Sequence, residues 1–258
     1  MEVNTPLDPF PLWTILPLTV GLALLSVELG YRLARNRQLR AQEEKESQVG
    51  GMVGATLGLL AFMLAFTFGL AGSRFEDRRQ IVLAEANAIG TTYLRTSMIP
   101  EPMRTEARNL LREYVAVRLE GVQQPGKLQQ SIARSEELQN RLWAQAVAAT
   151  ERERSPMTAL FVQSLNEVID LHATRIMAGL RSRVPGVIWI VLYLLGFLSM
   201  VILGYHAGLA NSKRPVAAVA LILGFSLVLV LIADLDRPGQ GMLKVSQQSM
   251  IDLRESMQ

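Results

Sequence analysis

Four apolar runs of bilayer length constrain the fold of this 258-residue chain more than any other feature. A helix needs roughly 20 mostly apolar residues, at about 1.5 Å per residue, to cross a bilayer. The charged residues, 19% of the chain, gather between these runs. The pattern therefore predicts four transmembrane helices, over residues 12–31, 52–73, 187–207 and 216–233.

The first run is expected to be retained as a membrane span. Its N-terminal flank, "MEVNTPLDPFP", has no basic residue, and no small-residue cleavage site follows at a suitable distance. The chain then divides into segments by hydropathy. They are a tail with the first span (1–31), a polar loop (32–51), the second span (52–73), an extramembrane region (74–186), the third span (187–207), a loop (208–215), the fourth span (216–233) and a C-terminal tail (234–258).

The extramembrane region reads as helical throughout. The second span continues without proline to about residue 98, so one helix of about 47 residues and roughly 70 Å is expected. Pro100 and Pro102 end it, and amphipathic patterns follow over 103–122 and 128–153. Ser155 and Pro156 then supply an N-cap and a first-turn proline for a helix to Arg183. The fold class predicted is an all-α, polytopic membrane protein with a helical bundle inserted between spans two and three.

Two stripes divide the second span. Small residues recur at steps of three and four, and bulky residues are expected on the opposite side. The small, helix-packing stripe is Gly54, Gly58, Ala61, Ala65, Gly69 and Gly72. The bulky stripe is Leu59, Phe62, Phe66 and Leu70, with Met63 beside it.

Two interpretations of these stripes stay open. In the first, the small face packs closely against another span of the same subunit and the aromatic rings face lipid. In the second, several copies pack through the small face around an axis, and the bulky residues form an apolar neck that gates a pore by dewetting.

Five charges follow the second span directly, and they also allow two interpretations. They are interfacial anchors that pair with one another at helical spacing, or they form the mouth of a pore that selects ions by charge. The five are Arg74, Glu76, Asp77, Arg78 and Arg79.

Three blocks of the sequence resemble the bacterial bestrophin-like membrane proteins. They are "LLAFMLAFTFGLAGSRFEDRRQIVLAEANAIGTTYLR", "LNEVIDLHATR" and "DLDRPGQGMLKVSQQSM". The resemblance implies a ring of subunits, five in bestrophins, around a pore that the second span lines and that passes anions such as chloride. Two bestrophin features are missing here: the tryptophan pair after the second span and the acidic cluster of the calcium clasp. Calcium gating is therefore not implied.

The side of the membrane on which the bundle lies has two opposing indications. Basic residues in the loops at 32–51 and 208–215 predict, by the positive-inside rule, that these loops are cytoplasmic and the bundle periplasmic. Bestrophins keep their bundle in the cytoplasm, and basic residues also flank the membrane ends on the bundle side. We favour the periplasmic side, for a multi-pass protein of the bacterial inner membrane.

Several polar residues are candidates for further sites. Glu28 lies inside the first span and either pairs with Arg32 or has a function in the membrane. Asp234, Asp236 and Arg237 stop the fourth helix at the interface. A buried polar network between the two stalk helices is proposed from Glu85, Asn87, Asn166, Glu167, Asp170, His172 and Arg175. His172, on an apolar seam, is either a hydrogen-bonded core residue or a proton sensor that titrates near neutral pH.

Composition argues against other functional classes. The chain has no cysteine, only two histidines and no glycine-rich phosphate loop, so neither an enzyme nor a metal or cofactor site is expected. No basic patch with interleaved aromatic residues indicates nucleic acid. The function predicted is a homo-oligomeric ion channel in the lipid bilayer, with inorganic ions as its substrate. The alternative is a membrane-anchored helical scaffold or sensor that conducts no ion.

Overall fold

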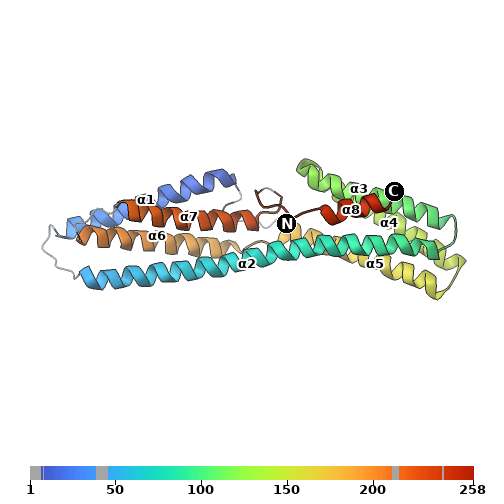
Figure 1. Ribbon diagram of the computed structural model, residues 1–258, viewed down its shortest axis with the longest axis horizontal. Coiled ribbons are helices and arrows are strands. Elements are labelled where there is room, and N and C mark those ends of the chain that lie inside the picture. Colours follow the sequence, from blue (N-terminus) through green and yellow to red (C-terminus); the bar gives the residue numbers. More distant parts are fainter. Residues whose placement is uncertain (1–6, 8, 39–45, 211–214, 240) are drawn as a thin grey trace. The chain divides into compact units, whose positions relative to one another are not determined.

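The computed structural model describes residues 7, 9–38, 46–210, 215–239 and 241–258, and these ranges contain helices but no strand (Figure 1). The all-α prediction is confirmed. The loop residues Arg40, Lys45, Lys213 and Arg214, which bear on sidedness, lie outside the described residues. The α-helices are α1 (Leu12–Gln38), α2 (Glu46–Arg95), α3 (Met103–Gln123), α4 (Leu128–Arg152), α5 (Pro156–Ile176), α6 (Gly186–Leu209), α7 (Pro215–Asp236) and α8 (Gln248–Ser256).

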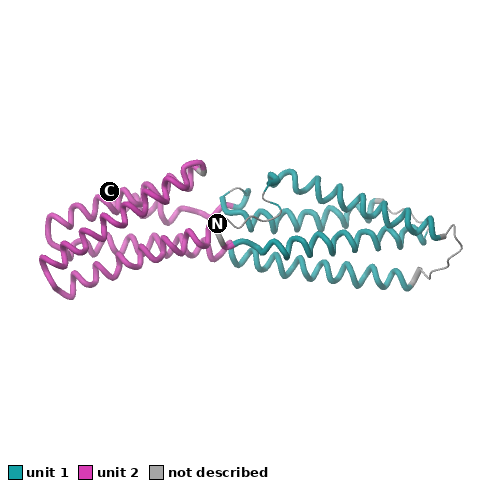
Figure 2. Tube along the Cα trace, turned by 180° about the vertical axis from the view of Figure 1, so that it is seen from behind, with its two compact units in different colours: residues 1–74, 183–243 teal, residues 75–182, 244–258 magenta. Residues whose placement is uncertain are grey.

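The chain forms two compact units (Figure 2). One, here called the membrane unit, comprises Met1–Arg74 and Arg183–Leu243. The other, here called the bundle, comprises Phe75–Ser182 and Lys244–Gln258. Helix α2 contributes to both, and its 50 residues span about 75 Å at 1.5 Å per residue.

The membrane unit holds four helices that are long and apolar enough to cross a bilayer: α1, the first part of α2, α6 and α7. Helices α1 and α6 approach each other closely within this unit. A Cβ added to Gly30 would overlap the Val201 carbonyl, and one added to Gly204 would overlap the Val27 carbonyl. Close approach through small residues is how helices pack well in lipid, so here glycines join α1 to α6.

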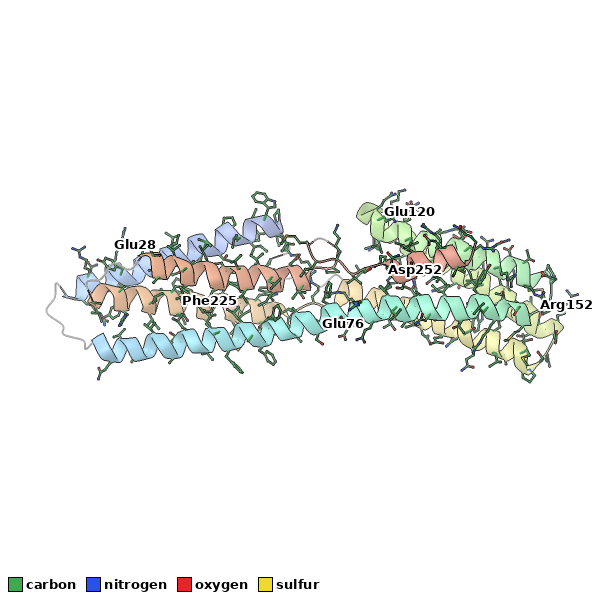
Figure 3. All side chains as sticks on the ribbon, in the orientation of Figure 1. Glu28, Glu76, Glu120, Arg152, Phe225 and Asp252 are labelled. Carbon is green, nitrogen blue, oxygen red and sulfur yellow. The ribbon has the colours of Figure 1, made fainter. Side chains whose placement is uncertain are left out.

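Glu28 makes a surface ion pair rather than a buried membrane site. Its carboxylate lies on the outside of α1 (Figure 3) and accepts a 2.6 Å hydrogen bond from Arg32 Nε. Both side chains are more than half exposed. The spacing of four residues, with the acid first, is the favourable orientation on a helix.

The core of the bundle is apolar and comes from the end of α2 together with α3, α4, α5 and α8. Burying side chains of this size contributes about 1.5–3 kcal/mol each. The largest fully buried members are Tyr114, Phe161, Ile89, Ile99, Leu110, Leu111, Leu138, Leu142 and Leu165.

Two features of the bundle bear on the expected helix ends. The Ser155 hydroxyl accepts a 3.2 Å hydrogen bond from the Thr158 amide, so the predicted N-cap of α5 is confirmed. The helix does not continue to Arg183, however, because α5 ends at Ile176 and a π-helix (Met177–Arg181) follows. Gly179 disfavours regular helix there, and Pro185 cannot donate a helical hydrogen bond.

The C-terminal tail folds onto the bundle, which the sequence reading did not predict. Met250 in α8 and Met257 after it are buried in the core. The Met257 carbonyl accepts a 2.7 Å hydrogen bond from Arg112 Nε and a 3.3 Å bond from the Tyr93 hydroxyl. Residues 244–258 are therefore a structural part of the bundle.

Candidate functional site

The bulky stripe of α2 projects from the membrane unit without being covered by it. Leu59, Phe62 and Phe66 are 49%, 66% and 61% exposed, and Leu70 is half-buried. Phenyl rings this exposed must contact lipid or another subunit, because water would be expelled from such a surface.

The small stripe is also uncovered. A Cβ built on Gly54, Gly58, Gly69 or Gly72 would meet no atom of the described residues within 4 Å, apart from the helix's own backbone and the two chain neighbours. Ala61 and Ala65 are exposed as well. The interpretation that this face packs against another span of the same subunit is therefore wrong. Within the subunit, α2 instead buries a third face, formed by Leu60, Leu64, Thr67 and Ala71.

The two exposed stripes are neighbours on the helix rather than opposites. At about 100° per residue, the centre of the bulky stripe lies roughly 100° from the centre of the small stripe. The buried face occupies the remaining side. The expectation that the stripes oppose each other is therefore wrong, and α2 has one face for its own subunit and two unpartnered faces.

The five charged residues beyond the second span also differ in exposure. Arg78 is only 6% exposed, with its guanidinium 6.0 Å from the centre of the Phe75 ring, and Arg74 is half-buried. Glu76, Asp77 and Arg79 are exposed, and Glu76 accepts a 3.4 Å bond from Arg79. Arg74 and Arg78 thus do not belong to an exposed charged mouth.

A buried ionic cluster lies in the bundle around Glu85, whose side chain is fully buried. The Glu85 carboxylate pairs with Arg118 Nε at 3.0 Å and accepts a hydrogen bond from Arg175. The Tyr114 hydroxyl donates to the same carboxylate at 3.2 Å. Arg175 also donates a 2.7 Å bond to the Gln247 side-chain oxygen. One carboxylate therefore neutralises one of the two arginines, and the cluster keeps a net positive charge.

This cluster contains three of the seven residues expected in a polar network: Glu85, His172 and Arg175. The structure contradicts the expectation for the other four, which lie exposed on the outer sides of α2 and α5. A surface location suits them, since charged and amide groups remain hydrated there. The four are Asn87, Asn166, Glu167 and Asp170. The Asn166 side-chain amide donates a 2.9 Å bond to the Asp170 carboxylate on the surface of α5.

Sequence reasoning missed four members of the cluster: Tyr114, Arg118, Gln139 and Gln247. Arg118 offered a signal, because it continues the apolar seam of α3 at a spacing of four residues after Tyr114. A charged residue on a buried seam requires a partner of opposite charge. Gln139 and Gln247 offered none, since their neighbours come from distant parts of the chain.

His172 is a core residue, 3% exposed, whose Nδ1 lies 3.2 Å from the Tyr114 hydroxyl. That hydroxyl gives its one proton to Glu85 and accepts a bond from Gln139 at 3.3 Å. His172 must then donate from Nδ1, which fixes the tautomer. Nε2 is buried and has no hydrogen-bond partner among the described residues.

The electrostatics of the cluster keep His172 neutral. Burial first, and then the positive charge of Arg118, lower the pKa of His172 to about 4. Burial would raise the pKa of Glu85, but Arg118 and Arg175 outweigh it and hold this pKa below its usual value. The expectation of a sensor that titrates near neutral pH is therefore wrong, and the alternative of a hydrogen-bonded core histidine holds.

The end of α7 bears three buried charges that bind the protein's own backbone. Asp234 accepts bonds from the amides of Met242 and Leu243 at 2.8 and 3.1 Å. Asp236 accepts from the Val184 amide at 2.7 Å and from Arg183 Nε at 3.1 Å. Arg237 donates to the carbonyls of Leu7 and Phe10. These contacts occupy both carboxylates and the Arg237 guanidinium at the end of the fourth span.

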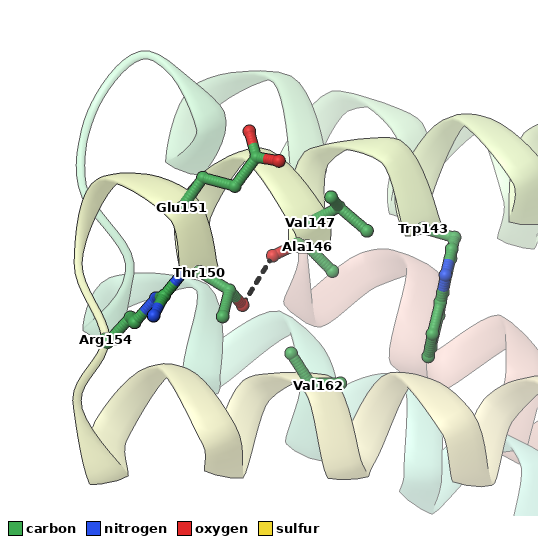
Figure 4. A pocket seen from close by; sticks show the side chains of 7 residues that line it. All are labelled: Trp143, Ala146, Val147, Thr150, Glu151, Arg154 and Val162. Carbon is green, nitrogen blue, oxygen red and sulfur yellow. Dashed lines mark hydrogen bonds between the residues drawn. The ribbon is translucent and has the colours of Figure 1, made fainter.

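A shallow apolar pocket lies between α4 and α5 (Figure 4). Its volume is about 180 Å³, and Trp143, Val147 and Val162 form its walls. The Thr150 hydroxyl donates a 2.9 Å bond to the Ala146 carbonyl at its floor. Among the described residues, no three His, Asp or Glu side chains come close enough together to hold a metal ion.

Comparison with known proteins agrees with this architecture. The bestrophin-like domain family matches residues 18–250. A crystal structure of a bacterial bestrophin homologue from Klebsiella pneumoniae superimposes with a TM-score of 0.66 at 14% identity, covering 95% of this chain and 96% of the other. A mutant of that homologue gives 0.67 at 15% identity, covering 95% and 96%. No curated protein matches the sequence. The chain therefore belongs to the bestrophin-like family, as the three sequence blocks had indicated.

Proposed function

We propose that this protein is one subunit of a homo-oligomeric ion channel of the bacterial inner membrane, with α2 lining a central pore. The observation that carries the proposal is the uncovered small stripe of α2. A face of glycine and alanine turned to lipid would gain little packing, whereas a second copy can approach it closely. The resemblance to bestrophins implies five copies.

The three faces of α2 suit a ring of subunits. One face packs within its own subunit, and the small stripe receives a neighbouring copy. The side directly opposite the buried face then turns to the axis, and on a helical wheel it is centred near Phe62. Phe66 flanks it on the bulky side. Rings of phenyl groups at this level would form an apolar neck that controls conduction by dewetting.

The exposed charges favour cations over the anions that the family resemblance implied. Of the exposed mouth residues, Glu76 and Arg79 pair with each other. The exposed Asp77 carboxylate has no ion pair or hydrogen bond among the described residues. A ring of carboxylates concentrates cations at a pore entrance. The arginines that would attract anions, Arg74 and Arg78, turn toward their own subunit.

Ion flux from vesicles that contain the purified protein tests the proposal. Phe66→Ala should raise the flux because it widens the neck, and Asp77→Asn should lower the preference for cations. Leu227→Ala is the matched control, since Leu227 is 58% exposed on α7. Absence of flux from both the wild type and Phe66→Ala would contradict conduction.

The pocket beside Trp143 favours a second candidate, a membrane-anchored scaffold or sensor. Trp143 is 41% exposed in a hollow that Glu151 and Arg154 also line, and such aromatic anchors are common at protein interfaces. A subunit that purifies as a monomer and passes no ion, yet loses a binding partner on Trp143→Ala, would favour the scaffold. Neither candidate requires enzymatic activity.

A further inference from the structure

The chain passes between the membrane unit and the bundle at three places. Aspartates at the end of α7 bind the residues beside two of them. One passage lies inside α2, after Arg74; the others lie between Ser182 and Arg183 and between Leu243 and Lys244. The α2 passage is a continuous helix. The other two are short non-helical connections, and each begins at a segment bonded to an aspartate of α7.

Asp234 fixes the connection that leads to the C-terminal segment. Its two carboxylate oxygens each take one amide, from Met242 and from Leu243. Asp234 is 2% exposed, and a Cβ at Gly241 would overlap its carboxylate, so the turn lies directly against it. Both oxygens being in use, an asparagine of the same size could satisfy only one of the two amides.

Asp236 fixes the connection that comes from α5. It is 1% exposed, and its two oxygens bind the Val184 amide and Arg183 Nε. The segment so held lies at the start of α6 and follows the π-helix (Met177–Arg181). Here too both oxygens are occupied by different donors.

Both connections lead to the same residue of the bundle, Arg175. Along one, Arg175 precedes Arg183 by eight residues, most of them helical. Along the other, Gln247 follows Leu243 by four residues and accepts the 2.7 Å bond from Arg175. Four residues extend to at most about 14 Å, so this connection is short. Arg175 also bonds to Glu85 at the centre of the bundle.

We propose that Asp234 and Asp236 are positioning residues that join the end of α7 to the buried Glu85 cluster through a closed circuit. The circuit runs from Asp234 through Leu243 and Gln247 to Arg175, and returns through Arg183 to Asp236. A displacement of the last turn of α7 is passed to Arg175 along both arms, and a change at Arg175 is passed back. This inference does not depend on ion conduction.

Hydrogen exchange of the backbone amides tests the circuit from the bundle side. Gln247→Ala removes one neutral side chain and leaves the Glu85 ion pairs in place, so the protein should fold. Because coupling is reciprocal, we expect several-fold faster exchange at the amides of Val184, Met242 and Leu243, which donate to the two aspartates. Asp252→Asn, an exposed change in α8 of the same tail, is the matched control and should leave these amides unchanged.

The reverse experiment uses Asp234→Asn and Asp236→Asn, with exchange read around Arg175 in residues 171–178. Both variants should accelerate exchange there. The proposal is overturned if Gln247→Ala accelerates exchange in the bundle but leaves the amides of Val184, Met242 and Leu243 unaffected. This outcome decides the matter even if the aspartate variants fail to fold. Ion flux is measured in a separate experiment. Failure of conduction can therefore be told apart from failure of the circuit.

Discussion

Acidification should destabilise the protein through His172, at a pH where the carboxylates are still ionised. The pKa of His172 is lowered to about 4 by burial and by Arg118, whereas an unfolded histidine titrates near 6.5. Between these values the unfolded chain takes up a proton that the folded chain does not. Stability is therefore complete above about pH 6.5 and falls as the pH decreases toward 4.

The size of the effect follows from the two pKa values. Stability changes by about 1.4 kcal/mol per pH unit for each proton that only the unfolded state binds. From pH 7 to pH 5 the loss attributable to His172 is then about 2 kcal/mol. Glu85 does not contribute in this interval, because its lowered pKa affects stability only below the unfolded value of 4.5.

Denaturant unfolding in detergent, followed by helical circular dichroism at pH 5, 6 and 7, measures this slope. His172→Gln should remove about 2 kcal/mol of the pH dependence, whatever its effect on stability at pH 7. His206→Gln, which changes the chain's other histidine, is the control and should keep the full slope. Equal slopes in the His172 variant and the wild type would refute the assignment of a buried neutral histidine.

Three further outcomes are expected. Glu85→Gln should cost about 3–5 kcal/mol in unfolding experiments, because it leaves two buried arginines without a counter-charge, whereas Asn87→Ala on the exposed side should stay within about 0.5 kcal/mol. Gly204→Leu should prevent α1 from approaching α6 and lower the melting temperature; an unchanged melting temperature would contradict that packing. Gly58→Leu should leave the subunit folded but reduce the oligomeric fraction in native mass spectrometry, and an intact oligomer would count against the small stripe as an interface.

The sequence predicted those features that depend on local physical constraints. Bilayer thickness requires runs of about 20 apolar residues, so the four spans could be recognised from hydropathy. The Ser155 cap could be recognised because capping involves only residues within one turn. The uninterrupted α2 followed from the absence of proline before Pro100.

Features that depend on distant contacts could not be predicted in the same way. Glu85 binds side chains from α3, α5 and, through Arg175, the tail before α8, and no local pattern specifies that arrangement. The sequence showed the two stripes of α2. It could not show which face of α2 is covered within the subunit, because that depends on how α1, α6 and α7 pack. Arg78 was expected at an exposed mouth and is buried, because its position on the helix follows Leu64 and Ala71 on the covered side.

The symmetry of the purified protein, seen in a density map in lipid nanodiscs, tests the central claim most directly. The account predicts a closed ring of identical subunits, with α2 nearest the axis, Phe62 facing the axis and Gly58 and Ala65 against a neighbouring copy. A single subunit, or a dimer in which the small stripe of α2 faces acyl chains, would contradict it.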